Sequence, residues 1–234
     1  MRKWRRALFY LLVLVAAGLL AFFADIALHI GDELIARPLF YPALQMVPAS
    51  ELASLPLATR FDFPVGSEHG AMAYNAQRFT ENKHLGDDLN GIGGEDSDLG
   101  DPIFTIADGR VLLARDGGSG WGNVIIVLHA YDEKGHRKYA QSYYAHLQTM
   151  LVTAREEVWR GEQIGTVGTA QGRYWAHLHF EMREFTTPFI GPGYREDTRG
   201  WIDPSAFIAA HRGAPEEDVG RPAVQVSPVP AATP

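Results

Sequence analysis

Short apolar runs separated by glycine-rich turns dominate the chain from Phe61 to about Ala210. Within each run, apolar and polar residues alternate with a period of two, as expected for strands that bury one face. The glycine-rich segment 116–122 suits a hairpin, because glycine tolerates the positive φ of such turns. The pattern predicts an antiparallel all-β domain. The clearest runs are Gly109 to Ala114, Asn123 to His129, Lys138 to Leu147 and Ala176 to Arg183.

Composition limits the chemistry that such a domain can perform. The 234 residues include no cysteine, which excludes disulfides, thiolate metal sites and cysteine nucleophiles. Any bound metal must therefore use histidine and carboxylate ligands. Four of the 21 basic residues lie in the first six positions, and the other 17 stand against 28 acidic residues. So acidic a body makes nucleic acid an unlikely partner, because phosphate binding depends on clustered lysine and arginine.

An uncharged segment follows the basic residues 1–6 and runs from Ala7 to Ala24. Its 18 residues are just long enough to cross a hydrocarbon core as a helix. Positive charge before the segment and almost none directly after it predicts that residues 1–6 are cytoplasmic and the rest lies outside. We therefore expect a single-pass transmembrane anchor over residues 7–24. A cleaved signal peptide is the alternative, but Phe22-Phe23-Ala24 fits a small-x-small cleavage site poorly.

The flanks of the predicted β domain differ from it in composition. Residues 25–60 contain four spaced prolines that disfavour long regular elements, so we expect a stalk or wrapping segment there. Residues 213–234 are rich in proline and poor in large apolar side chains, which predicts a disordered tail. The domain itself is predicted to span residues 61–212.

The run from Ala176 to Arg183 carries the strongest chemical signal. Strict alternation places Ala176, Leu178, Phe180 and Met182 on the core face and leaves His177, His179 and Glu181 on the other. A single histidine in a strand is usually structural, whereas two at positions i and i+2 on the face away from the core suggest a metal site. A solvated strand face remains the alternative.

Two further segments could complete such a site. His84 and Asp88 are four positions apart, so they share a face in either a strand or a helix, and Gly86 between them permits close backbone approach. Taken alone, His84 to Asp88 is as well explained by a surface turn. In the second segment, alternation predicts that Tyr144 and His146 share one strand face.

In combination the three segments resemble the lysostaphin/LytM-type zinc endopeptidases of peptidoglycan, whose signatures are HxGxD, a YxHL-like histidine and HLHFE. Here these read His84-Leu85-Gly86-Asp87-Asp88, Tyr144-Ala145-His146-Leu147 and His177-Leu178-His179-Phe180-Glu181. The resemblance implies an antiparallel, two-sheet, sandwich-like metallopeptidase domain that cuts peptide stems or bridges of the bacterial cell wall. With the predicted anchor, that domain would face the periplasm or the extracellular space.

The same resemblance assigns roles to five residues. It implies that His84, Asp88 and His179 bind one Zn²⁺ per chain, and that His146 and His177 are catalytic and flank the attacking water. Glu181 would orient a histidine or be a plain surface carboxylate, and Tyr144 would support an oxyanion or only pack. Other functions remain as alternatives. Relatives of this fold that activate other cell-wall hydrolases lack one or more of the five residues, and related carboxypeptidases space the first His and Asp more widely.

Two segments depart from the family pattern. Tyr174-Trp175-Ala176 replaces a Gly-Pro that often precedes HLHFE, and residues 90–101 are longer and more acidic than the usual link. Both affect the expected choice of substrate rather than the chemistry. The acidic residues of this link could form a calcium loop, but a solvated insertion is the stronger interpretation.

Overall fold

The computed structural model describes residues 15, 16, 18–21, 23, 47–65, 73–118 and 120–213. The chain divides into two compact units, Met1–Leu44 with Phe189–Pro192, and Gln45–Pro188 with Gly193–Pro234. In the first unit, the described residues between 15 and 23 are helical. The predicted cytoplasmic segment 1–6, and all but the first residue of the predicted tail 213–234, lie outside the described residues.

The predicted anchor over residues 7–24, and with it the single-pass membrane protein, is wrong on this structure. None of the helices described is both long and apolar enough to cross a membrane. Lack of charge over 18 residues does not by itself establish a helix of spanning length. The other positions of 7–24 lie outside the described residues.

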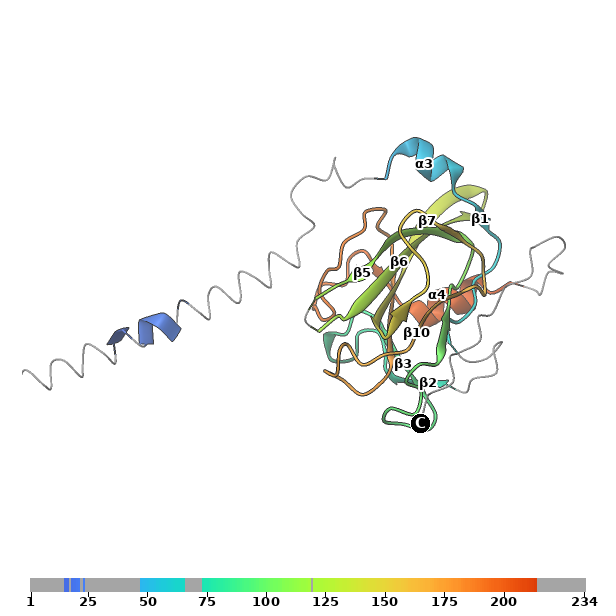
Figure 1. Ribbon diagram of the computed structural model, residues 1–234. Coiled ribbons are helices and arrows are strands. Elements are labelled where there is room, and N and C mark those ends of the chain that lie inside the picture. Colours follow the sequence, from blue (N-terminus) through green and yellow to red (C-terminus); the bar gives the residue numbers. More distant parts are fainter. Residues whose placement is uncertain are drawn as a thin grey trace, which may run out of the picture. The chain divides into compact units, whose positions relative to one another are not determined.

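Strands predominate in the described part of the second unit (Figure 1). They are β1 (Leu57–Ala58), β2 (Ala73–Gln77), β3 (Asp87–Gly91), β4 (Pro102–Phe104), β5 (Gly109–Asp116), β6 (Asn123–Glu133), β7 (His136–Leu147), β8 (Thr149–Met150), β9 (Glu157–Val158), β10 (Gln163–Thr166), β11 (Leu178–Arg183) and β12 (Trp201–Ile202). The helical elements are α3 (Ala49–Ser54), the 3₁₀ turn η2 (Glu81–Lys83) and α4 (Pro204–His211).

The strands form two sheets. The larger has the order β2-β3-β11-β7-β6-β5-β9, with β1 added beside β6 and β12 beside β11, and the smaller has the order β4-β10-β8. All pairings are antiparallel except that of β1 with β6. The predicted antiparallel β architecture is confirmed, while all-β becomes mostly β because of α3 and α4. Helix α4 begins where Pro204 follows Asp203, whose side chain accepts the N–H of Ala206.

Strand β6 is apolar without interruption from Val124 to Leu128 because both of its faces are buried. Alternate residues such as Ile125 and Val127 face the main core, while Leu128 and Ala130 belong to a second cluster with Val47 and Leu55. The strand is therefore covered on both faces, which removes the alternation expected of a half-buried strand. Part of the predicted stalk, residues 47–58, packs on this strand as α3 and β1.

The main core lies between the large sheet, α4 and the smaller sheet. It contains the four alternating residues of the β11 segment that were predicted to face it, together with Ile103, Ile164 and Ile208 from the other elements. That face assignment is confirmed. It leaves the opposite face of β11, with His179 and Glu181, free to line a site.

Gly86 lies where the backbone before β3 crosses β11. A Cβ atom at this position would overlap the carbonyl oxygen of Phe180 and come within 2.8 Å of Glu181 Cγ. The carbonyl belongs to the strand backbone and cannot rotate away, so only glycine allows this approach. The close contact predicted for Gly86 is confirmed.

His129 is a structural histidine in β6. Its buried ring donates through Nδ1 to the carbonyl of Asp108 at 2.9 Å, and Nε2 accepts the hydroxyl of Ser142 at 2.7 Å. Burial disfavours the charged ring and lowers the pKa of His129 to about 4, against a smaller opposing effect of the Asp108 carbonyl. The folded chain therefore holds this histidine neutral.

This burial predicts a pH dependence of stability. The unfolded chain binds the extra proton near the ordinary pKa of 6.5, so stability is complete above that pH and falls as the pH drops toward 4. The pKa difference corresponds to about 3 kcal/mol. Urea unfolding at pH 7 and pH 4.5 should show a smaller loss for His129→Gln than for the wild type. His136→Gln, at an exposed position of β7, should keep the wild-type loss, and equal losses in all three proteins would contradict the assignment.

Replacing Gly86 tests the contact between β3 and β11. Gly86→Ala should force the strands apart, costing roughly 1–3 kcal/mol of unfolding free energy and weakening the cross-strand nuclear Overhauser contacts between them. Gly135→Ala is the control: its position has φ +82 but open space around it, so it should be strained without moving β3. Unchanged cross-strand contacts in Gly86→Ala would refute the steric argument.

Candidate metal and catalytic site

Asp88 and His179 are brought together by the register of two neighbouring strands. They are directly opposite each other in the antiparallel pairing of β3 with β11. His84 precedes β3 and adopts an extended backbone, which carries its side chain to the same place as Asp88. Residues nearly a hundred positions apart thus meet because one strand pairing is in register.

A strained turn precedes His84 and is held by backbone hydrogen bonds to a later loop. Thr80, Asn82 and Lys83 all have positive φ, a conformation that costs free energy for residues with a Cβ atom. Two backbone hydrogen bonds hold the turn. The N–H of Leu85 donates to the carbonyl of Gly193, and the N–H of Arg195 donates to the carbonyl of Lys83. The position of His84 therefore depends on a loop more than a hundred residues later in the chain.

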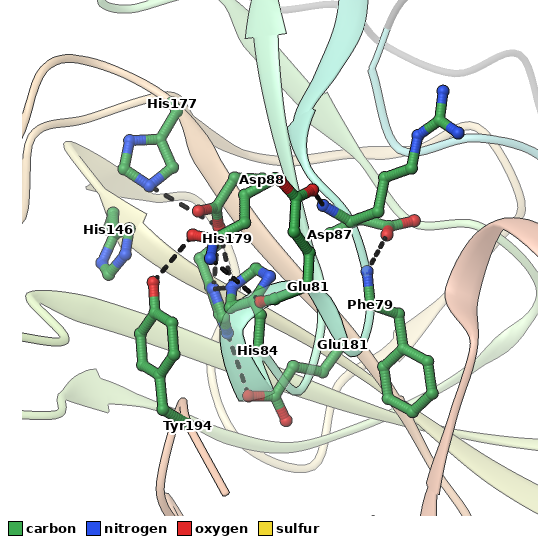
Figure 2. A network of polar contacts seen from close by, with 12 residues as sticks. Phe79, Glu81, His84, Asp87, Asp88, His146, His177, His179, Glu181 and Tyr194 are labelled. Carbon is green, nitrogen blue, oxygen red and sulfur yellow. Dashed lines mark hydrogen bonds and ion pairs between the residues drawn. The ribbon is translucent and has the colours of Figure 1, made fainter. Parts of the chain in front are cut away.

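Three side-chain atoms converge in this cluster (Figure 2). His84 Nε2, Asp88 Oδ1 and His179 Nδ1 are separated by 3.0 Å between the two imidazoles, 3.2 Å from His84 to Asp88 and 3.0 Å from His179 to Asp88. In a tetrahedral site with ligand bonds near 2.0 Å, ligand atoms would be about 3.3 Å apart. These three residues form a metal-sized group in the part of the chain that is described.

The protonation pattern indicates that the cluster needs a cation. His179 Nε2 donates to Glu181 Oε1 at 2.9 Å, so a neutral His179 presents a bare Nδ1 to the Asp88 carboxylate. Two acceptors at 3.0 Å require a proton or a metal ion between them. Burial opposes charge on His179, but its hydrogen bonds to Asp88 and Glu181 outweigh burial and raise its pKa to about 9. Burial likewise raises the pKa of Asp88, and the His179 and His84 hydrogen bonds overcome it and hold that pKa well below its usual range.

Glu181 is a fully buried orienting group rather than a surface carboxylate. One of its oxygens accepts the His179 ring, and the other accepts Arg183 Nε and Trp201 Nε1, each at 2.6 Å. Burial would raise the pKa of Glu181, but the Arg183 charge and the His179 hydrogen bond lower it. A carboxylate held in this way fixes both the tautomer and the orientation of the histidine.

His146 reaches the cluster through a β-bulge in β7. Its φ is +66, and the pairing of β7 with β6 shifts register there, because Ala145 and His146 together oppose one residue of β6. The predicted shared face of Tyr144 and His146 is therefore wrong. Tyr144 lies in the core, where its hydroxyl accepts the N–H of Ile106, so it packs and has no contact with the site.

The rings of His146 and His177 lie close together, 4.8 Å between centroids, beside the three-atom cluster (Figure 2). Each is held through Nδ1 by a backbone carbonyl: His146 by Trp121 at 3.1 Å and His177 by Trp175 at 2.8 Å. Nδ1 is thus the donor in both rings, which leaves each Nε2 as an acceptor. His177 Nε2 is 3.7 Å from Asp88 Oδ1. Burial, then the nearby His179 and His177, lower the pKa of His146 to about 3, so its ring is neutral at pH 7.

Four of the five predicted residues, Asp88, His146, His177 and His179, line a cavity of about 410 Å³, and the fifth, His84, is fully buried. Trp121, Tyr194 and Gln77 also line the cavity and were not predicted from the sequence. The Trp121 ring packs against His179, and the Tyr194 hydroxyl donates to Gln77 Oε1 at 2.9 Å across the mouth of the site. The glycines around Trp121 were the one available signal, since they mark a loop that can approach closely. Nothing local distinguishes Tyr194 or Gln77.

The acidic link after β3 is not a second metal site among the described residues, where the histidine and aspartate cluster is the one group of suitable geometry. Asp98 instead caps a turn by accepting the N–H of Gly91 at 2.8 Å. The calcium alternative thus finds no support in the described part of the chain.

Comparison with known proteins places this chain in a family. Peptidase family M23 matches residues 89–190, a range that includes His146, His177 and His179 and begins just after Asp88. Lipoprotein NlpD of Yersinia enterocolitica is 43% identical over 84 residues, 36% of this chain and 78% of that protein. That relative is named a lipoprotein, and this name gives no support to the predicted single-pass topology.

Two other similarities cover a smaller share of the related protein. Murein hydrolase activator NlpD of Escherichia coli is 42% identical over 84 residues, so this chain spans about a fifth (20%) of that relative. The solved structure of lysostaphin from Staphylococcus simulans is 21% identical, with a TM-score of 0.41, over 68% of this chain and 55% of that one. The family match and the extent of the Yersinia similarity agree with the resemblance carried by the three motifs: the chain belongs to peptidase family M23.

Proposed function

We propose that the protein is a zinc-dependent endopeptidase that hydrolyses peptide crosslinks of bacterial peptidoglycan. The observation that carries the proposal is the convergence of His84 Nε2, Asp88 Oδ1 and His179 Nδ1 within 3.2 Å of one another, beside two histidines with free acceptor nitrogens. The proposed catalytic domain covers residues 61–212, with the segment 47–58 packed on it.

The donor set suits zinc in both chemistry and charge. Two imidazoles and one carboxylate are the ligands of many catalytic zinc sites, which keep a fourth position for water or substrate. Asp88 and Glu181 bring two negative charges to the site and Arg183 returns one positive charge, which leaves one net negative charge that a bound cation would offset. A zinc ion held there would polarise the scissile carbonyl and lower the pKa of the attacking water.

His146 and His177 would manage the protons of the reaction. Because Nδ1 of each ring donates to a backbone carbonyl, each Nε2 is ready to accept the proton of the attacking water. The ring that takes this proton then becomes an acid for the leaving amine, whereas the other ring could stabilise the negative charge on the carbonyl oxygen only when its own Nε2 carries a proton. Their separation of 4.8 Å lets both rings face one scissile bond.

The second candidate function is activation of another cell-wall hydrolase. The observation in its favour is the name of the Escherichia coli relative, a murein hydrolase activator that is 42% identical over the matched region. In that function the same cavity would bind a partner protein or peptidoglycan without hydrolysis. The retention of all five site residues supports the enzyme, whereas the names of relatives support the activator.

Variants of the site separate the metal from the proton transfers. The purified wild type should contain about one zinc per chain and release soluble fragments from crosslinked peptidoglycan, and a chelator should stop the release. His179→Ala should lose both zinc and activity, while His146→Ala and His177→Ala should keep zinc and lose roughly 100-fold or more in rate. Zinc content is measured by elemental analysis, and mass spectrometry of the fragments identifies the bond that is cut.

His136→Ala serves as the control because it removes an exposed histidine at the opposite end of β7 from His146. It should match the wild type in both assays. If the wild type releases nothing by itself but accelerates a purified cell-wall hydrolase, and His146→Ala does so equally well, the activator replaces the enzyme. Zinc-free wild type that digests peptidoglycan would refute the proposed mechanism.

A further inference from the structure

The link after β3 reaches the other side of the site and contacts the residue before His177. Asp96, in this link, accepts the backbone N–H of Ala176 through Oδ1 at 2.8 Å. Asn90, at the end of β3, donates from Nδ2 to the carbonyl of Ala176 at 3.2 Å. Both backbone polar groups of Ala176 are therefore held by side chains, just before strand β11 begins.

The Asp96 contact is made to one end of a rigid peptide unit whose other end holds His177. The N–H of Ala176 and the carbonyl of Trp175 belong to the same planar amide, and the two groups point in opposite directions. That carbonyl accepts Nδ1–H of His177 at 2.8 Å. One amide thus links a carboxylate to a catalytic imidazole in a continuous hydrogen-bonded line.

We propose that Asp96 is a positioning residue that sets the tautomer and orientation of His177 through this amide, while Asn90 holds the carbonyl of the following amide. A carboxylate at the N–H end polarises the amide and makes its carbonyl a stronger acceptor, because hydrogen bonds in a chain reinforce one another. His177 then keeps its proton on Nδ1 and directs the bare Nε2 toward the site. The role given to His177 rests on the proposed function, whereas the tautomer does not.

Asp96 has no competing partner for this task. Among the described residues its side chain forms no ion pair, and the contact with Ala176 is the one hydrogen bond of that side chain, while its backbone carbonyl accepts the N–H of Leu99. The link itself is anchored at both ends: Gly91 donates to the buried Asp98, and Gly100 donates to Val167 at 2.9 Å. Asp96, Asn90, Trp175 and His177 all line one groove of about 820 Å³ next to the catalytic cavity. The acidic insertion therefore forms part of the wall of the site.

The first test uses nitrogen chemical shifts of the imidazoles in the zinc-loaded, full-length chain labelled with ¹⁵N-histidine. The His177 signals, assigned by their loss in His177→Ala, should show a proton on Nδ1 in the wild type. In Asp96→Ala they should show a mixture of both tautomers. A proton on Nε2 in the wild type, or an unchanged tautomer in Asp96→Ala, would overturn the proposal. This result does not depend on any hydrolytic activity.

The second test uses turnover. Asp96→Ala should lower kcat roughly 10- to 100-fold, as loss of an outer orienting partner commonly does, with KM within about twofold and one zinc retained. Asp96→Asn keeps an acceptor oxygen and should recover most of the rate. Glu95→Gln removes a neighbouring negative charge without touching the amide and should behave as wild type. Loss of zinc in Asp96→Ala, or full activity, would contradict positioning, whereas an inactive wild type would contradict the proposed function alone.

Discussion

The site depends on two acceptor atoms that the fold holds too close together to be stable alone. Asp88 and His179 are opposite each other in a strand pairing, and Glu181 keeps the proton of His179 on the far nitrogen. The structure therefore creates a local need for positive charge, which a proton meets in the absence of metal. The grouping of ligand atoms that could hold a cation follows from the register of β3 and β11 rather than from any single residue.

The buried network behind His179 makes that register costly to change. Glu181 is shared between His179, Arg183 and Trp201, and the Arg183 guanidinium lies 3.9 Å from the centre of the Tyr143 ring. Breaking a buried, hydrogen-bonded charge pair leaves the remaining charge unpaired, a loss of about 3–5 kcal/mol. The core-facing and site-facing sides of β11 are thus stabilised by different means, apolar packing on one side and paired charges on the other.

Much of this arrangement was predictable from local patterns. Alternation placed the four strands β5, β6, β7 and β11 nearly where they lie and assigned the correct core face of β11. It failed at His146, because a bulge and a positive φ reverse the face of one residue, and a period of two cannot contain that information. Trp121 and Tyr194 were missed because they come from loops whose position is set by tertiary contacts. The anchor prediction was wrong, since none of the described helices is long and apolar enough to cross a membrane.

Residues 47–58 pack on β6, so the chain enters the β domain at this strand. β1 runs parallel to β6, a strand in the interior of the larger sheet. Leu55 lies in the same apolar cluster as Leu128 of β6. A mechanical load applied from the N-terminal side would enter at the middle of the sheet and pull in shear along β6. Such a load would act on the two-residue pairing of β1 with β6 and on the apolar cluster that holds Leu55, instead of on an edge strand of the sheet.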